Sequence, residues 1–163
     1  MSDDYTETIA RNKKARHNYY VDEQYEAGIS LLGSEVKSLR ERRVHLKDSY
    51  ASFMDGELYL VNAHIAPYPH ATHENHEPER PRKLLLHRNE LDRLKAKVDQ
   101  EGYTLIPLSM YFKDNKIKVD LGVCKGKKQE DKRRDLKKRE HEREIEREQA
   151  RRDKRNYASD DYY

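Results

Sequence analysis

Apolar and polar residues alternate with the two-residue period of a β-strand over much of the first 124 positions. From His17 to Leu32 the apolar side chains fall mainly on odd positions, and the polar run 22–24 interrupts them, which predicts a strand with a bend or bulge. The segments 50–54 and 57–61 flank Asp55-Gly56, a pair that readily supplies the positive φ angles of a two-residue hairpin turn. The pattern therefore predicts a β-hairpin here.

A second hairpin is predicted about Asp114-Asn115, between the segments 103–112 and 116–123. Its second strand places apolar residues on one face and polar residues on the other. The apolar set is Ile117, Val119, Leu121 and Val123. Between the two hairpins, apolar residues recur at helical spacing from Leu91 to Val98, which predicts a helix that ends at Gly102.

Together these elements predict a mainly β fold with two or three short helices, one of them capped by Ser34. The arrangement that fits best is a small antiparallel barrel of the oligonucleotide-binding (OB) type. The segment 67–81 has four prolines and no apolar rhythm, so it predicts a long surface loop. Residues 1–10 are polar and acidic and are expected to be disordered, which assigns the barrel to residues 11–124.

Residues 125–163 form a tail of different composition. It holds 15 Lys and Arg against 11 Asp and Glu, whereas the preceding 124 residues hold 19 against 20. Leu136 and Ile145 are its only sizeable aliphatic residues, so a helix here has no apolar stripe to bury. We expect this basic tail to be disordered when free and helical on a polyanion.

The nearly neutral barrel can attract a polyanion only through local basic clusters. Three are present: Arg11, Lys13, Lys14 and Arg16; Lys37, Arg40, Arg42, Arg43 and Lys47; and Arg80, Arg82, Lys83 and Arg88.

Composition excludes several classes of protein. The single cysteine, Cys124, rules out an internal disulfide scaffold and a thiolate zinc cluster. The chain has no run of about 20 apolar residues and begins with an acidic segment, so we expect a cytoplasmic protein without a membrane partner. No nucleophile motif, paired carboxylates or Gly-rich phosphate loop stands out, which argues against an enzyme and against a cofactor.

His70, His73 and His76 are spaced three residues apart, which on a helix would place all three on one side as metal ligands. The flanking prolines, however, are incompatible with a helix here. A solvated loop is therefore the better interpretation than a metal site.

Several motifs, in order, resemble the small protein B family, the SsrA-binding proteins. They are Asn12-Lys13-Lys14-Ala15-Arg16-His17, Tyr25-Glu26-Ala27-Gly28-Ile29, the stretch 33–40, Asp48-Ser49-Tyr50, Arg82-Lys83-Leu84-Leu85-Leu86, Glu101-Gly102-Tyr103-Thr104, Gly126-Lys127-Lys128 and Asp131-Lys132-Arg133. The resemblance covers roughly residues 11–139 and implies a non-enzymatic RNA-binding protein with an OB-type barrel.

Members of that family bind the tRNA-like domain of transfer-messenger RNA and deliver it, with elongation factor Tu, to ribosomes stalled without a stop codon. The barrel replaces the missing anticodon half of a tRNA, and the tail enters the empty messenger channel near the decoding centre. The resemblance therefore implies that this chain takes part in trans-translation, the rescue of stalled ribosomes.

The resemblance also implies two sets of functional residues. The expected RNA-binding residues are Asn12, Lys13, Lys14, Arg16, His17, Glu26, Lys37, Arg82, Lys83, Leu85 and His87. The expected ribosome-contacting residues are Gly126, Lys127, Lys128, Asp131, Lys132, Arg133, Lys137, Lys138 and Arg139. Two positions depart from the pattern, since His87 stands where some members have Asn and Glu130 where others have His or Tyr.

Two other functions fit parts of the sequence. A general single-stranded nucleic-acid-binding OB protein would use the same barrel but discriminate weakly between folded and unstructured RNA. A metal-assisted hydrolase would depend on the His70, His73 and His76 loop.

Overall fold

The computed structural model describes residues 5–71 and 74–160 and divides the chain into two compact units, 1–126 and 127–163. The described elements follow one another as β1 (Thr6–Arg11), α1 (Ala15–Asn18), β2 (Tyr19–Ile29), α2 (Gly33–Arg40), β3 (Val44–His45), β4 (Tyr50–Met54), β5 (Glu57–Val61), β6 (His64–Ile65), β7 (Arg82–Leu85), α3 (Arg88–Glu101), β8 (Thr104–Lys113), β9 (Lys116–Gly126) and α4 (Gln129–Asp160).

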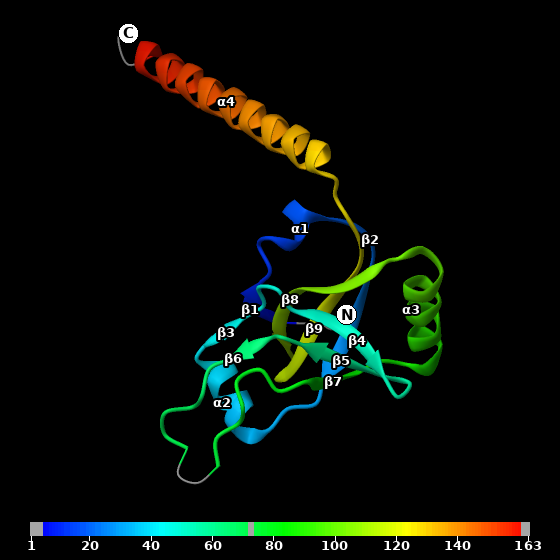
Figure 1. Cartoon of the computed structure of the whole chain (residues 1–163). Helices are drawn as coiled ribbons and strands as arrows, with labels where there is room; N and C mark the ends of the chain where they lie inside the picture. The colour runs from blue at the N-terminus through cyan, green and yellow to red at the C-terminus, as the bar shows by residue number, and fades with distance from the viewer. Residues whose placement is uncertain (1–4, 72–73, 161–163) are drawn as a thin grey trace. The chain divides into compact units, whose positions relative to one another are not determined.

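The first unit is a closed antiparallel barrel. Its strands pair in the order β8-β4-β5-β7-β2-β9, and β9 pairs with β8 to complete the ring. The edge of β8 that faces β4 at Leu105 also pairs with β1 further along, from Ser109 to Lys113. In the view of Figure 1, α1 lies above the barrel, α2 below it and α3 beside it. The OB-type barrel predicted from the pattern is therefore confirmed.

Both predicted hairpins are present. Asp55 and Gly56 have φ angles of 52° and 78°, and Asp114 and Asn115 have φ angles of 49° and 65°, so each turn uses two left-handed residues. Such turns match the right-handed twist of the strands that they join. The break predicted in β2 is also present, as a shift of register against β9 between Val21 and Glu23.

The first ten residues differ from the prediction. Residues 1–4 lie outside the described residues, but Thr6–Arg11 forms β1 against β8, and Ile9 is buried with the main core. One apolar side chain and a set of backbone pairs are enough to order this segment, because the exposed edge of β8 supplies the partner groups. The expectation of disorder is therefore wrong for residues 6–10.

One helix prediction and one strand prediction need correction at their starts. Helix α2 begins after Leu32, whose N–H donates to the Glu35 carboxylate at 2.8 Å, so Glu35 and not Ser34 satisfies the first turn. The segment that starts at His17 is helical to Asn18 before β2 begins. Helix α3 ends as predicted, with Gly102 at a φ of 66°.

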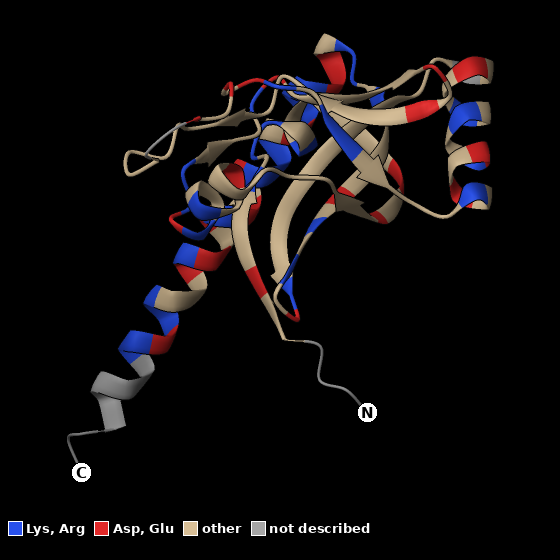
Figure 2. Cartoon of the chain, turned by 90° about the horizontal axis from the view of Figure 1, so that it is seen from below, with Lys and Arg blue, Asp and Glu red and all other residues tan. Residues whose placement is uncertain are grey.

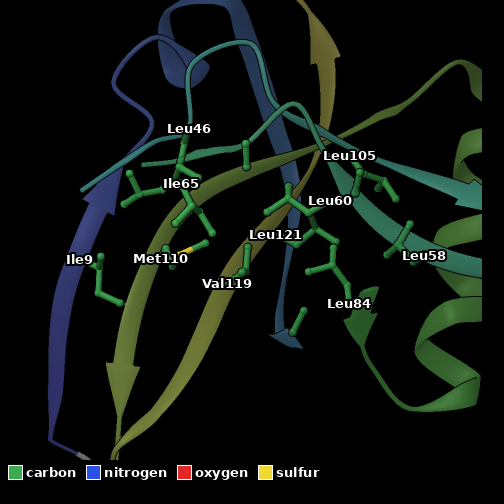
Figure 3. Close-up of a cluster of buried hydrophobic side chains, with 14 of the residues drawn as sticks. Ile9, Leu46, Leu58, Leu60, Ile65, Leu84, Leu105, Met110, Val119 and Leu121 are labelled. Atoms are coloured by element: carbon green, nitrogen blue, oxygen red, sulfur yellow. The ribbon is translucent and has the colours of Figure 1, made fainter. Parts of the chain in front are cut away.

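Apolar side chains from the whole ring of strands meet inside the barrel (Figure 3). Leu58 and Leu60 of β5, Leu84 of β7 and Leu121 of β9 are all at most 1% exposed. A second, smaller cluster comprises Ala15, Ile106, Leu108 and Cys124. It buries one face of α1, so it fixes the basic segment around that helix to the barrel.

Candidate nucleic-acid interface

The loop before α1 and α1 itself carry exposed cations on a fixed backbone. Lys13, Lys14 and Arg16 are exposed, whereas Ala15 between them is 2% exposed. His17, predicted to contact RNA, is half-buried in the same helix. Because Ala15 packs into the smaller cluster, the neighbouring cations are held at the surface in a defined arrangement.

The fold brings a second basic cluster to this segment. A surface depression is lined by residues of both clusters, namely Arg11, Lys13 and Lys14 of the first and Lys47 of the second. We call Arg11, Lys13, Lys14, Arg16 and Lys47 the cationic rim; Figure 2 marks the Lys and Arg positions of the chain in blue. Cations gathered in this way on a barrel of low net charge form a local site for phosphates.

Asn12 has a positioning role in this rim. Its side-chain nitrogen donates to the Pro107 carbonyl at 3.0 Å and to the Leu46 carbonyl at 3.4 Å. Its backbone N–H donates to the Leu108 carbonyl at 2.8 Å. Asn12 thus ties the rim to β8 and to the chain that follows β3.

Glu26 lies exposed on β2, where two residues of β8 hold its carboxylate. The Tyr111 hydroxyl donates to Glu26 Oε2 at 2.5 Å, and Lys113 Nζ lies 3.3 Å from both oxygens. The Tyr111 hydrogen bond, with help from Lys113, lowers the pKa of Glu26 although burial acts against it. A fixed, ionised carboxylate on a surface expected to meet RNA is suited to accept hydrogen bonds from base or ribose donors.

Arg82 does not lie on the surface. Its side chain is completely buried, and its Nε donates to Glu35 Oε2 at 2.5 Å. Its remaining nitrogens donate to the carbonyls of Ala63, Glu77 and Pro78. The expectation that Arg82 contacts RNA is therefore wrong for this fold, because every guanidinium nitrogen is already used inside the protein.

Arg80 shares the same carboxylate, with its Nη2 2.6 Å from Glu35 Oε1. The third basic cluster of the sequence is thus partly structural.

The other predicted RNA-binding residues of the barrel lie at or near the surface. Lys83 is half-exposed and pairs with Glu57 at 2.9 Å. Leu85, 50% exposed, and His87, exposed at the start of α3, remain available at the surface. Lys37 is exposed on α2, with Nζ 5.5 Å from the centre of the Tyr68 ring.

Among the described residues, which leave out His73, no group of three potential ligands is placed to hold a metal ion. His76 is 5% exposed, and its ring nitrogens contact the Ser34 hydroxyl and the Ile65 carbonyl, both at 2.9 Å. The prediction of a solvated loop is thus wrong for His76, which anchors the loop to α2 and β6. His70 is exposed, and His73 lies outside the described residues.

Cys124 offers no reactive thiol. The side chain is fully buried in the smaller cluster, and burial raises the pKa of the thiol to about 11.

The second unit consists mainly of the long helix α4. Gly126 ends β9, and Lys127 pairs with Asp135 of the helix, which lowers the pKa of that carboxyl. Leu136 and Ile145 are 45% and 49% exposed, so the helix buries no apolar stripe. The predicted ribosome-contacting residues from Lys128 to Arg139 lie at its start, where Asp131 and Lys132 are half-exposed and Arg133 is exposed. Lys and Arg alternate with Asp and Glu along the helix (Figure 2).

Sequence reasoning missed a polar depression between α1 and the turn that precedes β4. Asn18, Asp48 and Tyr50 line it together with Lys14. Asp48 and Tyr50 belong to a quoted motif, but nothing in their spacing indicated that α1 would lie beside them.

A closed barrel with a cationic rim, followed by a long charged helix without an apolar stripe, is the architecture expected of a small RNA-binding protein. Comparisons with known proteins lead to the same class. The family model described as "SmpB protein" matches residues 9–151. An SsrA-binding protein of Symbiobacterium thermophilum is 55% identical over 133 residues, covering 81% of this chain and 84% of the relative. That of Syntrophobacter fumaroxidans is 54% identical over 147 residues, covering 90% and 91%.

A solved structure described as "tmRNA-SmpB: a journey to the center of the bacterial ribosome" is also similar. It shares 53% identity with this chain at a TM-score of 0.62 and covers 74% of this chain and 85% of the other. This chain therefore belongs to the SmpB protein family, which is a family of RNA-binding proteins and not of enzymes.

Proposed function

We propose that this chain binds the tRNA-like domain of transfer-messenger RNA and brings that RNA to stalled ribosomes for trans-translation, in the cytoplasm. The observation that carries the proposal is the family match over residues 9–151, which includes the whole barrel and most of α4. The described residues contain no helix that is long and apolar enough to cross a membrane.

The barrel is proposed to hold the RNA. The cationic rim would neutralise phosphates, while Glu26 and the exposed Leu85 would contact nucleosides. His17, Lys37, Lys83 and His87 are proposed as further contacts, and Asn12 as the residue that positions the rim. Arg82 has no part in this surface, since it is buried.

The tail is proposed to act on the ribosome, where it would probe the empty messenger channel and the decoding centre. Its proposed contacts are Gly126, Lys127, Lys128, Asp131, Lys132, Arg133, Lys137, Lys138 and Arg139. Elongation factor Tu is proposed to join through the RNA complex.

Competition binding tests the proposal. Labelled transfer-messenger RNA bound to the full chain is challenged with unlabelled transfer-messenger RNA, tRNA and poly-U at several salt concentrations. We expect the unlabelled cognate RNA to compete best at every salt concentration. Equal competition by poly-U would contradict the proposal and favour a general single-stranded nucleic-acid-binding protein.

The salt dependence tests the role of the rim. Removing one lysine–phosphate interaction, as in Lys13→Ala or Lys14→Ala, should reduce the slope of log affinity against log salt by about one unit. Lys95→Ala changes a basic residue on the exposed side of α3 and should leave the slope unchanged. An unchanged slope in the rim variants would show that RNA does not use the rim.

A further inference from the structure

The depression beside α1 gathers side chains of unlike chemistry. An ammonium, an amide, a carboxylate and a phenol ring line it, supplied by Lys14, Asn18, Asp48 and Tyr50. Within residues 5–71 and 74–160, Lys14, Asn18 and Asp48 have no side-chain hydrogen bond or ion pair. Their donors and acceptors are therefore available to a ligand.

The turn that carries Asp48 is fixed by the protein itself. Asp48 has a φ of 61°, a left-handed conformation that is uncommon for a residue other than glycine. Ser49, 3% exposed, donates from its hydroxyl to the Leu46 carbonyl at 2.5 Å, and the Asn12 side chain donates to the same carbonyl. The carboxylate of Asp48 is thus presented to the depression by a pinned backbone.

The charges decide what kind of ligand fits. A groove for phosphates alone would carry only cations and neutral donors, because a carboxylate repels phosphate. Asp48 instead needs a partner that donates N–H groups. The Watson–Crick edge of guanine offers two adjacent donors, N1–H and N2–H, which match the two oxygens of one carboxylate.

The remaining side chains suit the rest of a nucleotide. Tyr50 is 39% exposed, which leaves ring surface for stacking on a base. Lys14 belongs to the cationic rim and supplies an ammonium group at the same depression for a phosphate of the same nucleotide. Ile106 and Tyr19 add apolar surface to the same depression.

We propose that this depression holds one unpaired guanine nucleotide of the bound RNA, with Asp48 accepting from its Watson–Crick edge, Tyr50 stacking on the base and Lys14 contacting a phosphate. The inference rests on the proposed function, because it assumes that the barrel binds a folded RNA, and it adds a base-specific contact to it.

Asp48→Asn tests the contact in the full chain, since Asn keeps the left-handed turn but cannot accept from both guanine donors. Affinity for a transcript of the tRNA-like domain should fall at least about fivefold. Simple electrostatics predicts the opposite, because removing a negative charge should tighten binding to RNA. Asp55→Asn is the matched control: Asp55 is also an exposed left-handed residue before a strand, but lies outside the depression, and its variant should bind at least as well as the wild type.

Mononucleotides test the base preference directly. We expect guanosine monophosphate to shift the amide resonances of Asp48, Tyr50 and Asn18 more than the adenosine, cytidine and uridine monophosphates do, and Asp48→Asn to abolish the difference. Tyr50→Phe should keep the preference, because the ring is retained. Equal shifts with all four nucleotides, or none, would overturn the proposal.

The two proposals fail separately. If the wild-type chain does not prefer transfer-messenger RNA to poly-U, the proposed function is wrong. If that preference holds but Asp48→Asn binds the transcript as well as the wild type or better, only the guanine site is wrong.

Discussion

Arg82 and Glu35 are 47 positions apart in the sequence, yet their side chains are buried together and joined at 2.5 Å. Burial acts to raise the pKa of Glu35, but the hydrogen bonds from Arg80, from the Leu32 N–H and from Arg82 outweigh it and lower that pKa. The pair connects α2 with β7 and with the loop that precedes it. Arg82, although it lies in a basic cluster of the sequence next to Lys83, is therefore part of the scaffold.

Arg82→Leu should destabilise the barrel strongly, because it leaves buried acceptors, including one oxygen of Glu35, without their donor. We expect a loss of about 3–5 kcal/mol in the free energy of unfolding, measured by urea denaturation. Arg88→Ala, at a side chain that is 80% exposed, should change it by less than about 0.5 kcal/mol. A similar small effect in both variants would contradict the structural role of Arg82.

Tyr111→Phe tests the environment of Glu26. The Tyr111 hydroxyl is the main cause of the lowered pKa of Glu26, so its removal should raise that pKa toward the ordinary value. Stability contributed by a carboxyl with a lowered pKa is present above the unfolded-state pKa and is lost as the pH falls through the folded-state pKa, so the variant should lose less stability in acid than the wild type. The measurement is an NMR titration of the Glu26 side-chain carboxyl carbon.

Tyr59→Phe is the control for this titration. Tyr59 also donates to a neighbouring carboxylate, that of Glu57, but on another part of the barrel. The Tyr59→Phe substitution should leave the pKa of Glu26 unchanged. An unaltered Glu26 pKa in Tyr111→Phe would show that the hydroxyl does not hold the carboxylate in solution.

At the scale of elements, local signals predicted the hairpins and the end of α3, because each depends on a few adjacent residues. The left-handed pair Asp55-Gly56 and the terminator Gly102 act within one turn. Strand β1 was missed because its order comes from a partner about a hundred positions away, with Thr6 opposite Lys113. The burial of Arg82 and the closeness of Lys47 to Lys13 likewise depend on closure of the barrel, which no local pattern reveals.

Gly102→Ala should destabilise the end of α3. Gly102 has a φ of 66°, which alanine adopts only with strain, so we expect a loss of about 1 kcal/mol in unfolding free energy. Gly33→Ala is the matched control, since an added methyl group at Gly33 meets no atom within 4 Å and the residue lies in helix α2. That variant should be neutral or slightly stabilising, and thermal denaturation of both variants checks the difference.

Helix α4 depends on local interactions, because it buries no apolar stripe. Favourable Glu–Arg pairs contribute a few tenths of a kcal/mol each, whereas ordering the backbone costs roughly 1–2 kcal/mol per residue. The isolated 125–163 peptide should therefore show little helix by circular dichroism in dilute buffer and become helical when RNA is added. Full helicity in dilute buffer would contradict this prediction.

At the scale of the whole molecule, the chain combines a barrel with an evenly balanced charge and a tail with an excess of cations. The distribution of charge and the motifs together predicted an RNA-binding barrel and a separate tail. They did not show which cations are exposed: Lys13 and Lys14 are at the surface, while Arg82 is not. The difference arises because burial of a basic side chain depends on an acidic partner, here Glu35, supplied by a distant element.

The most direct test of the account compares the full chain with residues 1–126, the first compact unit. Both proteins are measured for affinity to the tRNA-like domain and for rescue of ribosomes stalled on a message without a stop codon. We expect the shortened protein to bind the RNA nearly as well as the full chain and to lose rescue. Loss of RNA affinity on truncation, or rescue that persists without α4, would contradict the division of work between barrel and tail.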